Sequence, residues 1–265
     1  MKIVVCLKQI LDPEIPSSSF EIDDASKQAR IGKHALVINP FDENALEMAL
    51  QLKDKKDDVH ITALTYGDKR AEEALRKAFG VLADESVHIL KEDDIPEQSY
   101  PTATILARGI EKIGPVDLIM CGRQAGDWDA GTVPSLIAAE LGIPSLCFIF
   151  QMKMANGDLI FKREVEGGIE VFGFSKPMLV TVTNDEANVL RIAKVKDVMK
   201  AHRKPVRTLT LQEIDPENSH VSMPRDNLNK LYIPSTDNVC EIIDGDEPVE
   251  KVANLLKKLR DRKVL

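Results

Sequence analysis

The stretch VDLIMCGRQAGDWDAGTVPSLIAAEL, residues 116–141, contains the pattern that decides the fold. Its apolar start, Val116 to Met120, is typical of a buried strand, and the apolar residues of 135–141 have helical spacing. A glycine-bearing loop joins the two. In α/β proteins such a unit presents backbone N–H groups and a helix N-terminus to an anion. We interpret the loop as a nucleotide site, with a plain connecting loop as the alternative, and expect Pro134 at the first helical position.

The loop carries two carboxylates, Asp127 and Asp129. A bound phosphate would be repelled by them, because like charges repel. We therefore expect both side chains to accept hydrogen bonds from ribose hydroxyls or to cap backbone amides of the loop itself.

Strand-length apolar runs alternate with helical patterns along much of the chain. The runs cover residues 3–7, 59–65, 87–90, 116–120 and 179–182, and the helical patterns cover 43–55, 69–79 and 102–113. This alternation predicts an α/β fold with a mostly parallel, doubly wound sheet covered by helices on both faces. Ligands then bind at the carboxyl ends of the strands. Asp42 is the candidate N-cap of the first long helix.

The pattern after Leu141 predicts an antiparallel extension of the sheet. Asn156-Gly157 is a strong two-residue hairpin signal, and Gly167-Gly168 leads into a further apolar run. Periodicity weakens beyond Asp185, and the polar stretch 215–246 indicates an extended arm.

Residues 247–262 place apolar side chains on one helical face. We divide the chain into a nucleotide-binding α/β domain, 1–210, and a C-terminal arm with an amphipathic helix, 211–265. That helix is expected to pack on another subunit or, as the alternative, on its own domain.

Composition narrows the class of protein. The 265 residues are 43% hydrophobic and carry a net charge of −8, which excludes bulk attraction to nucleic acid. No apolar run approaches the roughly 20 residues that span a bilayer, and no secretion signal is visible. The cysteines lack metal-ligand spacing, so we expect free thiols in a reducing, cytoplasmic compartment and no metal site. These are Cys6, Cys121, Cys147 and Cys240.

Motifs of several enzyme classes are absent from the sequence. It contains no Walker loop, no G-x-G-x-x-G, no G-x-S-x-G, no H-E-x-x-H and no C-x-x-C. We therefore predict no catalytic residue. Basic residues do gather at 194–207, which indicates either a site for an acidic partner or a solvated helix face.

Five motifs follow one another along nearly the whole chain. They are Val5-Cys6-Leu7-Lys8-Gln9, Asn39-Pro40-Phe41, Gly122-Arg123-Gln124 with the Asp127–Asp129 loop, Arg163-Glu164-Val165-Glu166-Gly167-Gly168, and Val198-Met199-Lys200-Ala201. In this order they resemble the beta subunit of electron transfer flavoprotein. The resemblance implies an adenine-nucleotide α-hydrolase-like fold and a heterodimer with an alpha subunit. It also implies electron transfer between an acyl-CoA dehydrogenase-type flavoenzyme and a further redox partner.

The resemblance also implies which residues contact the nucleotide, and they fall in the strand-end loops chosen above. Phe41 would in addition approach the flavin held mainly by the partner subunit. The implied contacts are Cys6, Asn39, Pro40, Phe41, Asp42, Tyr66, Arg123, Gln124, Ala125, Gly126, Asp127, Trp128, Asp129, Ala130, Gly131, Thr132, Val133 and Pro134.

The nucleotide implied for this subunit is either AMP, as in simple carriers, or a second FAD, as in electron-bifurcating members. The Gly122-Arg123-Gln124 start and Val133 favour FAD. Trp128 either stacks on a ring or fills the space that a flavin needs. The rival from another class is an ATP-binding or hydrolysing protein of the same superfamily, and a third reading is an interaction scaffold.

The family's partner-recognition loop maps to about residues 183–205. Val195 aligns with the exposed leucine that anchors the dehydrogenase, and basic residues around it would form a polar rim. The alternative makes Val195 a core residue of a short helix. The rim residues are Lys194, Lys196, Lys200 and Arg203.

Overall fold

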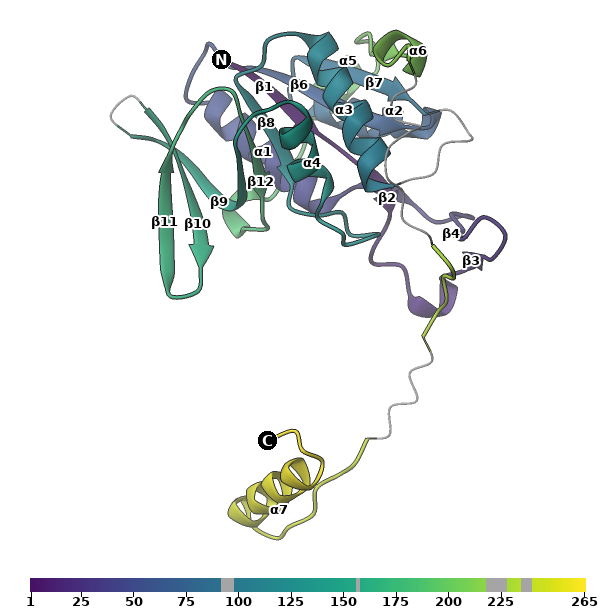
Figure 1. Ribbon diagram of the computed structural model, residues 1–265, viewed down its shortest axis with the longest axis vertical. Helices are drawn as coiled ribbons and strands as arrows, with labels where there is room; N and C mark the ends of the chain where they lie inside the picture. The colour runs from purple at the N-terminus through teal and green to yellow at the C-terminus, as the bar shows by residue number, and fades with distance from the viewer. Residues whose placement is uncertain (92–97, 156–157, 218–227, 235–239) are drawn as a thin grey trace. The chain divides into compact units, whose positions relative to one another are not determined.

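The computed structural model describes residues 1–91, 98–155, 158–217, 228–234 and 240–265 (Figure 1). Its central feature is a nine-stranded sheet with the order β11-β10-β9-β12-β8-β1-β6-β7-β13. The strands are β1 (Lys2–Cys6), β6 (His60–Gly67), β7 (Glu85–Leu90), β8 (Leu118–Gly122), β9 (Ser145–Ala155), β10 (Asp158–Val165), β11 (Gly168–Gly173), β12 (Met178–Val182) and β13 (Arg207–Leu209).

The centre of the sheet is parallel. β1 lies between β6 and β8, with Val5 opposite both Ala63 and Met120. From β1 the chain moves outward to β6 and β7, and then returns to the other side of β1 to form β8. Since the connections leave β1 and β8 in opposite directions, a crevice is expected outside the carboxyl ends of these two strands.

Helices cover both faces of the sheet, as predicted (Figure 1). One core cluster joins the sheet to α1 and α2, through residues such as Leu46 and Leu75, and a second joins it to α3 and α4, through Ile105 and Ile137. The apolar spacing seen in the sequence faces these cores. The helices are α1 (Pro40–Lys53), α2 (Glu72–Gly80), α3 (Ser99–Ile113), α4 (Val133–Glu140), α5 (Val195–Ala201), α6 (Leu211–Ile214) and α7 (Pro248–Asp261).

The predicted antiparallel extension is confirmed. β9 continues the sheet in parallel beside β12, and then pairs antiparallel with β10, which pairs antiparallel with β11. The Asn156-Gly157 turn itself lies outside the described residues, although Ala155 and Asp158 are paired. The doubly wound α/β class with an antiparallel extension is therefore the observed fold.

Several short elements were not predicted from the sequence. β2 (Gln9–Leu11) pairs antiparallel with β5 (Leu36–Ile38), and β3 (Ile22–Asp23) pairs with β4 (Gln28–Ala29). β13 adds a parallel strand beside β7. Single turns of 3-10 helix are η1 (Ser17–Ser19), η2 (Lys69–Ala71) and η3 (Glu186–Asn188).

The chain divides into two compact units, of which the larger comprises residues 1–21 and 29–229. The smaller comprises 22–28 and 230–265 and holds α7, the predicted C-terminal helix. Within it, Glu241 pairs with Lys258 of α7 and with Arg262, directly after α7. The predicted domain limits at residue 210 stay a prediction, while α6, just beyond them, buries Leu211 and Ile214 in the core of the larger unit.

Candidate functional site

The carboxyl ends of β1 and β8 meet the first turn of α1 at one carboxylate. Asp42 Oδ2 accepts a hydrogen bond from the Lys8 N–H at 2.7 Å, just beyond β1. Asp42 Oδ1 accepts one from the Gly122 N–H at 2.8 Å, at the end of β8. One buried side chain therefore holds two strand ends whose connections run in opposite directions.

The prediction that Asp42 caps α1 is wrong. The helix begins at Pro40, Asn39 stands at the N-cap position, and Asp42 is the third helical residue. Its side chain turns inward because the two strand-end N–H groups bind it there. Burial raises the pKa of Asp42 to about 7, and the hydrogen bonds from Lys8 and Gly122 work in the opposite direction.

Gly122 is required by the close approach of α1 to β8. A Cβ atom at this position would lie 2.4 Å from Asp42 Oδ1 and 2.7 Å from the Cβ of Phe41. Any larger residue would push the helix away from the strand. The first glycine of the loop motif thus sets the distance between helix and strand.

Asn39 ties the loop after β8 to the start of α1. Its Nδ2 donates to the Gln124 carbonyl at 2.8 Å, and its Oδ1 accepts from the Gly126 N–H at 3.1 Å. The residue is buried, so these bonds are shielded from water. Asn39 therefore fixes the course of the loop and is not free to contact a ligand through its amide.

The two loop carboxylates are both occupied within the protein. Asp127 Oδ2 pairs with Lys8 Nζ at 2.5 Å, and its Oδ1 caps the Trp128 N–H. Asp129 Oδ1 accepts from Gln124 Nε2. Capping of the loop's own amides, one of the two expectations, is what the structure shows for Asp127. The charge of this carboxylate is balanced by Lys8, which reduces its repulsion of an anion.

The loop ends at the N-terminus of α4. Pro134 is the second helical residue and not the first, because the helix begins at Val133. Gly131 has φ of +63°, a left-handed conformation that favours glycine. Among the described residues, no hydrogen-bond partner is found for the N–H groups of Gly131, Thr132 and Val133, so these donors remain available to an anion.

Arg123 adds a positive charge beside these donors. Its guanidinium lies over the Phe41 ring at 4.8 Å from the centroid, and Nη1 is 3.4 Å from Thr183 Oγ1. Within the described part of the chain its buried Nε has no hydrogen-bond partner. A buried N–H without a partner is costly, and a bound phosphate or carbonyl oxygen would satisfy it. The residues thus fit an anion such as a phosphate at the N-terminus of α4.

The remaining predicted contacts lie around this edge of the sheet. Trp128 is 44% exposed, which leaves a ring face for stacking. Tyr66 is the last residue but one of the neighbouring strand β6. Cys6 and Cys121 are buried side by side under the loop, where a hydrogen bond with Cys6, together with burial, raises the pKa of the Cys121 thiol. Pro40, Ala125 and Ala130 contribute backbone and apolar surface.

Lys8 and Thr183 belong to this site but were not among the predicted contacts. Lys8 lies in a strand-end loop that the sequence did indicate, yet its ion pair joins residues 119 positions apart. Thr183 directly follows β12, the next strand along the edge. The pairing of Lys8 with Asp127 and the place of Thr183 at the site follow only from the strand order.

The predicted docking residues lie in a separate segment between β12 and β13. Val195, at the start of α5, is 78% exposed, so the alternative that it belongs to the core is wrong. Ile192 is 95% exposed and Met199 is 59% exposed. The four basic rim residues come from the same segment: Lys194 directly before α5, Lys196 and Lys200 on it, and Arg203 just after it.

One ion-pair cluster and one set of hydrogen bonds hold this predicted docking segment against the helices α1 and α2. Arg191 makes paired bonds to the buried Glu47 of α1 and reaches Asp54, directly after α1, at 2.8 Å. At the other end, Arg76 of α2 donates to the carbonyls of Ala201 and Lys204. Ile192 and Val195 therefore project from a backbone that is fixed on both sides.

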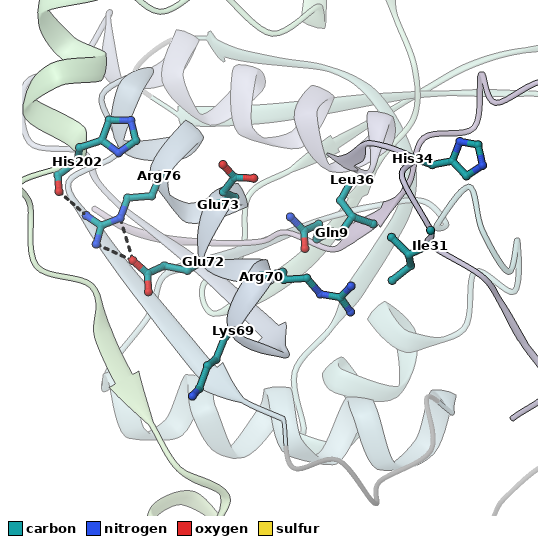
Figure 2. A pocket seen from close by; sticks show the side chains of 11 residues that line it. Gln9, Ile31, His34, Leu36, Lys69, Arg70, Glu72, Glu73, Arg76 and His202 are labelled. Atoms are coloured by element: carbon teal, nitrogen blue, oxygen red, sulfur yellow. Dashed lines mark hydrogen bonds and ion pairs between the residues drawn. The ribbon is translucent and has the colours of Figure 1, made fainter.

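A hollow of about 640 Å³ lies beside the start of α2, and Figure 2 shows its lining. Arg76 there contacts Glu72 and the His202 carbonyl, while His34 lies at the opposite end. No predicted nucleotide contact lines it, and the charges of its wall are mixed. We assign it no ligand.

Among the residues that the structure describes, no group of three or more His, Cys, Asp or Glu side chains is arranged to hold a metal ion. None of the described helices has the length and apolar composition that a membrane crossing requires.

Comparison with known proteins identifies the family. The family model for the electron transfer flavoprotein domain matches residues 31–214. The electron transfer flavoprotein subunit beta of Thermoanaerobacterium thermosaccharolyticum is 31% identical over 100% of both chains. The CarD subunit of the caffeyl-CoA reductase–Etf complex of Acetobacterium woodii is 29% identical, and the acryloyl-CoA reductase electron transfer subunit gamma of Anaerotignum propionicum is 30% identical, again over 100% of both chains. With a fold, a strand-end site and full-length similarity that agree, this chain belongs to the electron transfer flavoprotein beta subunit family.

Proposed function

We propose that this chain is the beta subunit of a heterodimeric electron transfer flavoprotein, and that it binds an adenine nucleotide between β1, α1 and α4. The observation that carries the proposal is a set of donors without partners: among the described residues, these are the N–H groups of Gly131, Thr132 and Val133 at the start of α4, and the buried Nε of Arg123 in the same loop. These donors suit a phosphate. A flavin, when bound in the complex, supplies the electron-transfer chemistry.

The nucleotide in this subunit is a second FAD or AMP, and the chain's own residues would hold either one by its phosphate. Lys8 keeps Asp127 from opposing the phosphate charge. Trp128 offers its exposed face to an adenine or isoalloxazine ring. Phe41, held under Arg123, would present an apolar edge to the flavin of the alpha subunit.

We further propose that the redox partner is an acyl-CoA dehydrogenase-type flavoenzyme. Two relatives are named for reductases of caffeyl-CoA and acryloyl-CoA, which are unsaturated CoA thioesters. Reduction of such a thioester is the reverse of an acyl-CoA dehydrogenation, so the similarity supports this class of partner. Val195 and Ile192 would enter an apolar pocket, and the basic rim would face acidic residues.

Helix α7 supports the proposed pairing with an alpha subunit. Val249 and Val252 are 81% and 55% exposed, and Leu255 and Leu256 are 42% and 39% exposed. An apolar helix face of this kind marks a protein-protein contact. The alpha subunit would cover it.

The test is to copurify the chain with its alpha partner, denature the complex and quantify the released FAD and AMP per heterodimer. Two FAD would indicate a second flavin in this subunit, and one FAD with one AMP would indicate a simple carrier. A complex without any adenine nucleotide beyond the alpha subunit's flavin would contradict the proposed site.

A further inference from the structure

The carboxylate of Asp42 is engaged entirely by the protein, although its residue lies among the predicted nucleotide contacts. Both oxygens accept strand-end N–H groups, at 2.7 Å from Lys8 and 2.8 Å from Gly122. The residue is 6% exposed. It therefore acts on a ligand through its neighbours and not by direct contact.

We propose that Asp42 is a positioning residue for the nucleotide: its ionised carboxylate fixes the ends of β1 and β8 and thereby aligns Lys8 and Arg123 with the phosphate site. This inference rests on the proposed function. Asp42 would thereby couple the ends of β1 and β8, the start of α1 and the loop after β8, at the crevice between oppositely directed connections.

Two short paths lead from Asp42 to the loop. On the β1 side, the Asp42 carboxylate binds the N–H of Lys8, and the Nζ of the same Lys8 pairs with Asp127. On the β8 side, it binds the N–H of Gly122, and Arg123 follows directly. An apolar side chain here would leave both strand-end N–H groups without an acceptor, whereas the two oxygens of a carboxylate accept from both at once.

Ionisation of Asp42 matters to this geometry. An ionised carboxylate accepts at both oxygens, whereas a protonated one carries an O–H that faces one of the two N–H donors. Protonation would therefore release one strand end and loosen the donors of the loop. The charged or titratable groups that face Asp42 are Lys8, just beyond β1, and Cys121 of β8, the latter in contact with Cys6 of β1.

The decisive measurement is the pKa of Asp42 in the wild-type heterodimer, determined with and without saturating AMP. The titration is monitored by ¹³C NMR of labelled carboxyl groups. If binding requires the ionised form, linkage demands that AMP lowers this pKa. A phosphate that acts on Asp42 only as a nearby negative charge would raise it. A lowered pKa supports the proposal, and a raised or unchanged pKa overturns it.

A pair of variants gives a second readout. Asp42→Asn keeps one acceptor and cannot ionise, so AMP affinity should fall about tenfold at pH 8 through loss of one charge-assisted bond, with a smaller difference at pH 6. Asp84→Asn is the matched control, because Asp84 also accepts a strand N–H, from Ile61, but at the amino-terminal edge of β6. Its AMP affinity should equal that of the wild type.

The phosphate of AMP titrates in the same pH range, but equally in all three proteins, so only the difference between them is interpreted. An Asp42→Asn variant with unchanged affinity at pH 8 would overturn the inference alone. Failure of both AMP and FAD to bind the wild-type complex would overturn the proposed function together with it.

Discussion

Asp42 illustrates at the residue scale what a sequence shows and what it hides. Its position after Asn39-Pro40 indicated the start of a helix, and the helix is there. The direction of its side chain depends on two N–H groups, from Lys8 and Gly122, that are distant in sequence. The neighbouring residues alone therefore indicated a helix cap, whereas in the tertiary structure the Asp42 carboxylate joins the ends of two strands.

The raised pKa of Asp42 predicts a pH-dependent stability. Because the folded-state pKa is raised from 3.8 to about 7, the protonated folded state carries no burial penalty below about pH 4, and stability is lost as pH rises through 7. Three pKa units correspond to an effect on the order of 4 kcal/mol. The thermal midpoint of the nucleotide-free complex should fall between pH 5 and 8 more steeply in the wild type than in Asp42→Asn. Parallel curves would contradict the assignment.

Gly131 provides a second prediction at this scale. Replacement by valine combines a strained left-handed backbone with a Cβ only 3.3 Å from the Arg123 carbonyl, so bound nucleotide should be lost. Gly142→Val is the control, since Gly142 has φ of +64° and no atom near its missing Cβ. Nucleotide released per heterodimer measures the difference. Full retention in Gly131→Val would place the phosphate elsewhere.

At the scale of elements, long periodic patterns were predictable and short pairings were not. The runs that became β1, β6, β7, β8 and β12 are apolar because both faces of the sheet are covered. β13 has three residues and joins the sheet only because β7 presents an open edge. Likewise β2 and β5 are short, and their pairing is decided by tertiary contacts.

The predicted docking segment between β12 and β13 provides a testable prediction at the scale of elements. Ile192→Ala and Val195→Ala should each lower the rate of electron transfer with an acyl-CoA dehydrogenase, by about tenfold for an anchor residue, through a raised KM. Bound nucleotide should not change. Val171→Ala, which removes an exposed apolar group from β11, is the control. Loss of nucleotide or of the heterodimer in the docking variants would argue against a docking role.

The whole molecule is incomplete without its proposed partner. Replacing both Leu255 and Leu256 of α7 by Asp should abolish copurification with the alpha subunit, because two charges would be buried in an apolar contact. Lys257→Asp, at the opposite side of the helix, should leave it intact. Unchanged copurification of the double variant would show that the helix packs elsewhere.

The candidate site was located from the sequence because strand order and loop chemistry agree at this scale. Parallel strands align their carboxyl ends, so loops after different strands had to meet. The sequence could not supply the pairing of Lys8 with Asp127 or the unpaired Nε of Arg123. Both depend on distances between segments far apart in the chain.

The bridge at Asp42 has a consequence for biogenesis. It joins residues 8, 42 and 122, and contacts of such sequence separation form late in folding, after the local hairpins and helices. A chain arrested before β8 inserts beside β1 has helices and strands but no phosphate cradle. Retention of the proposed nucleotide would thus report on maturation, because only a chain whose two halves of the sheet have joined would hold the ligand.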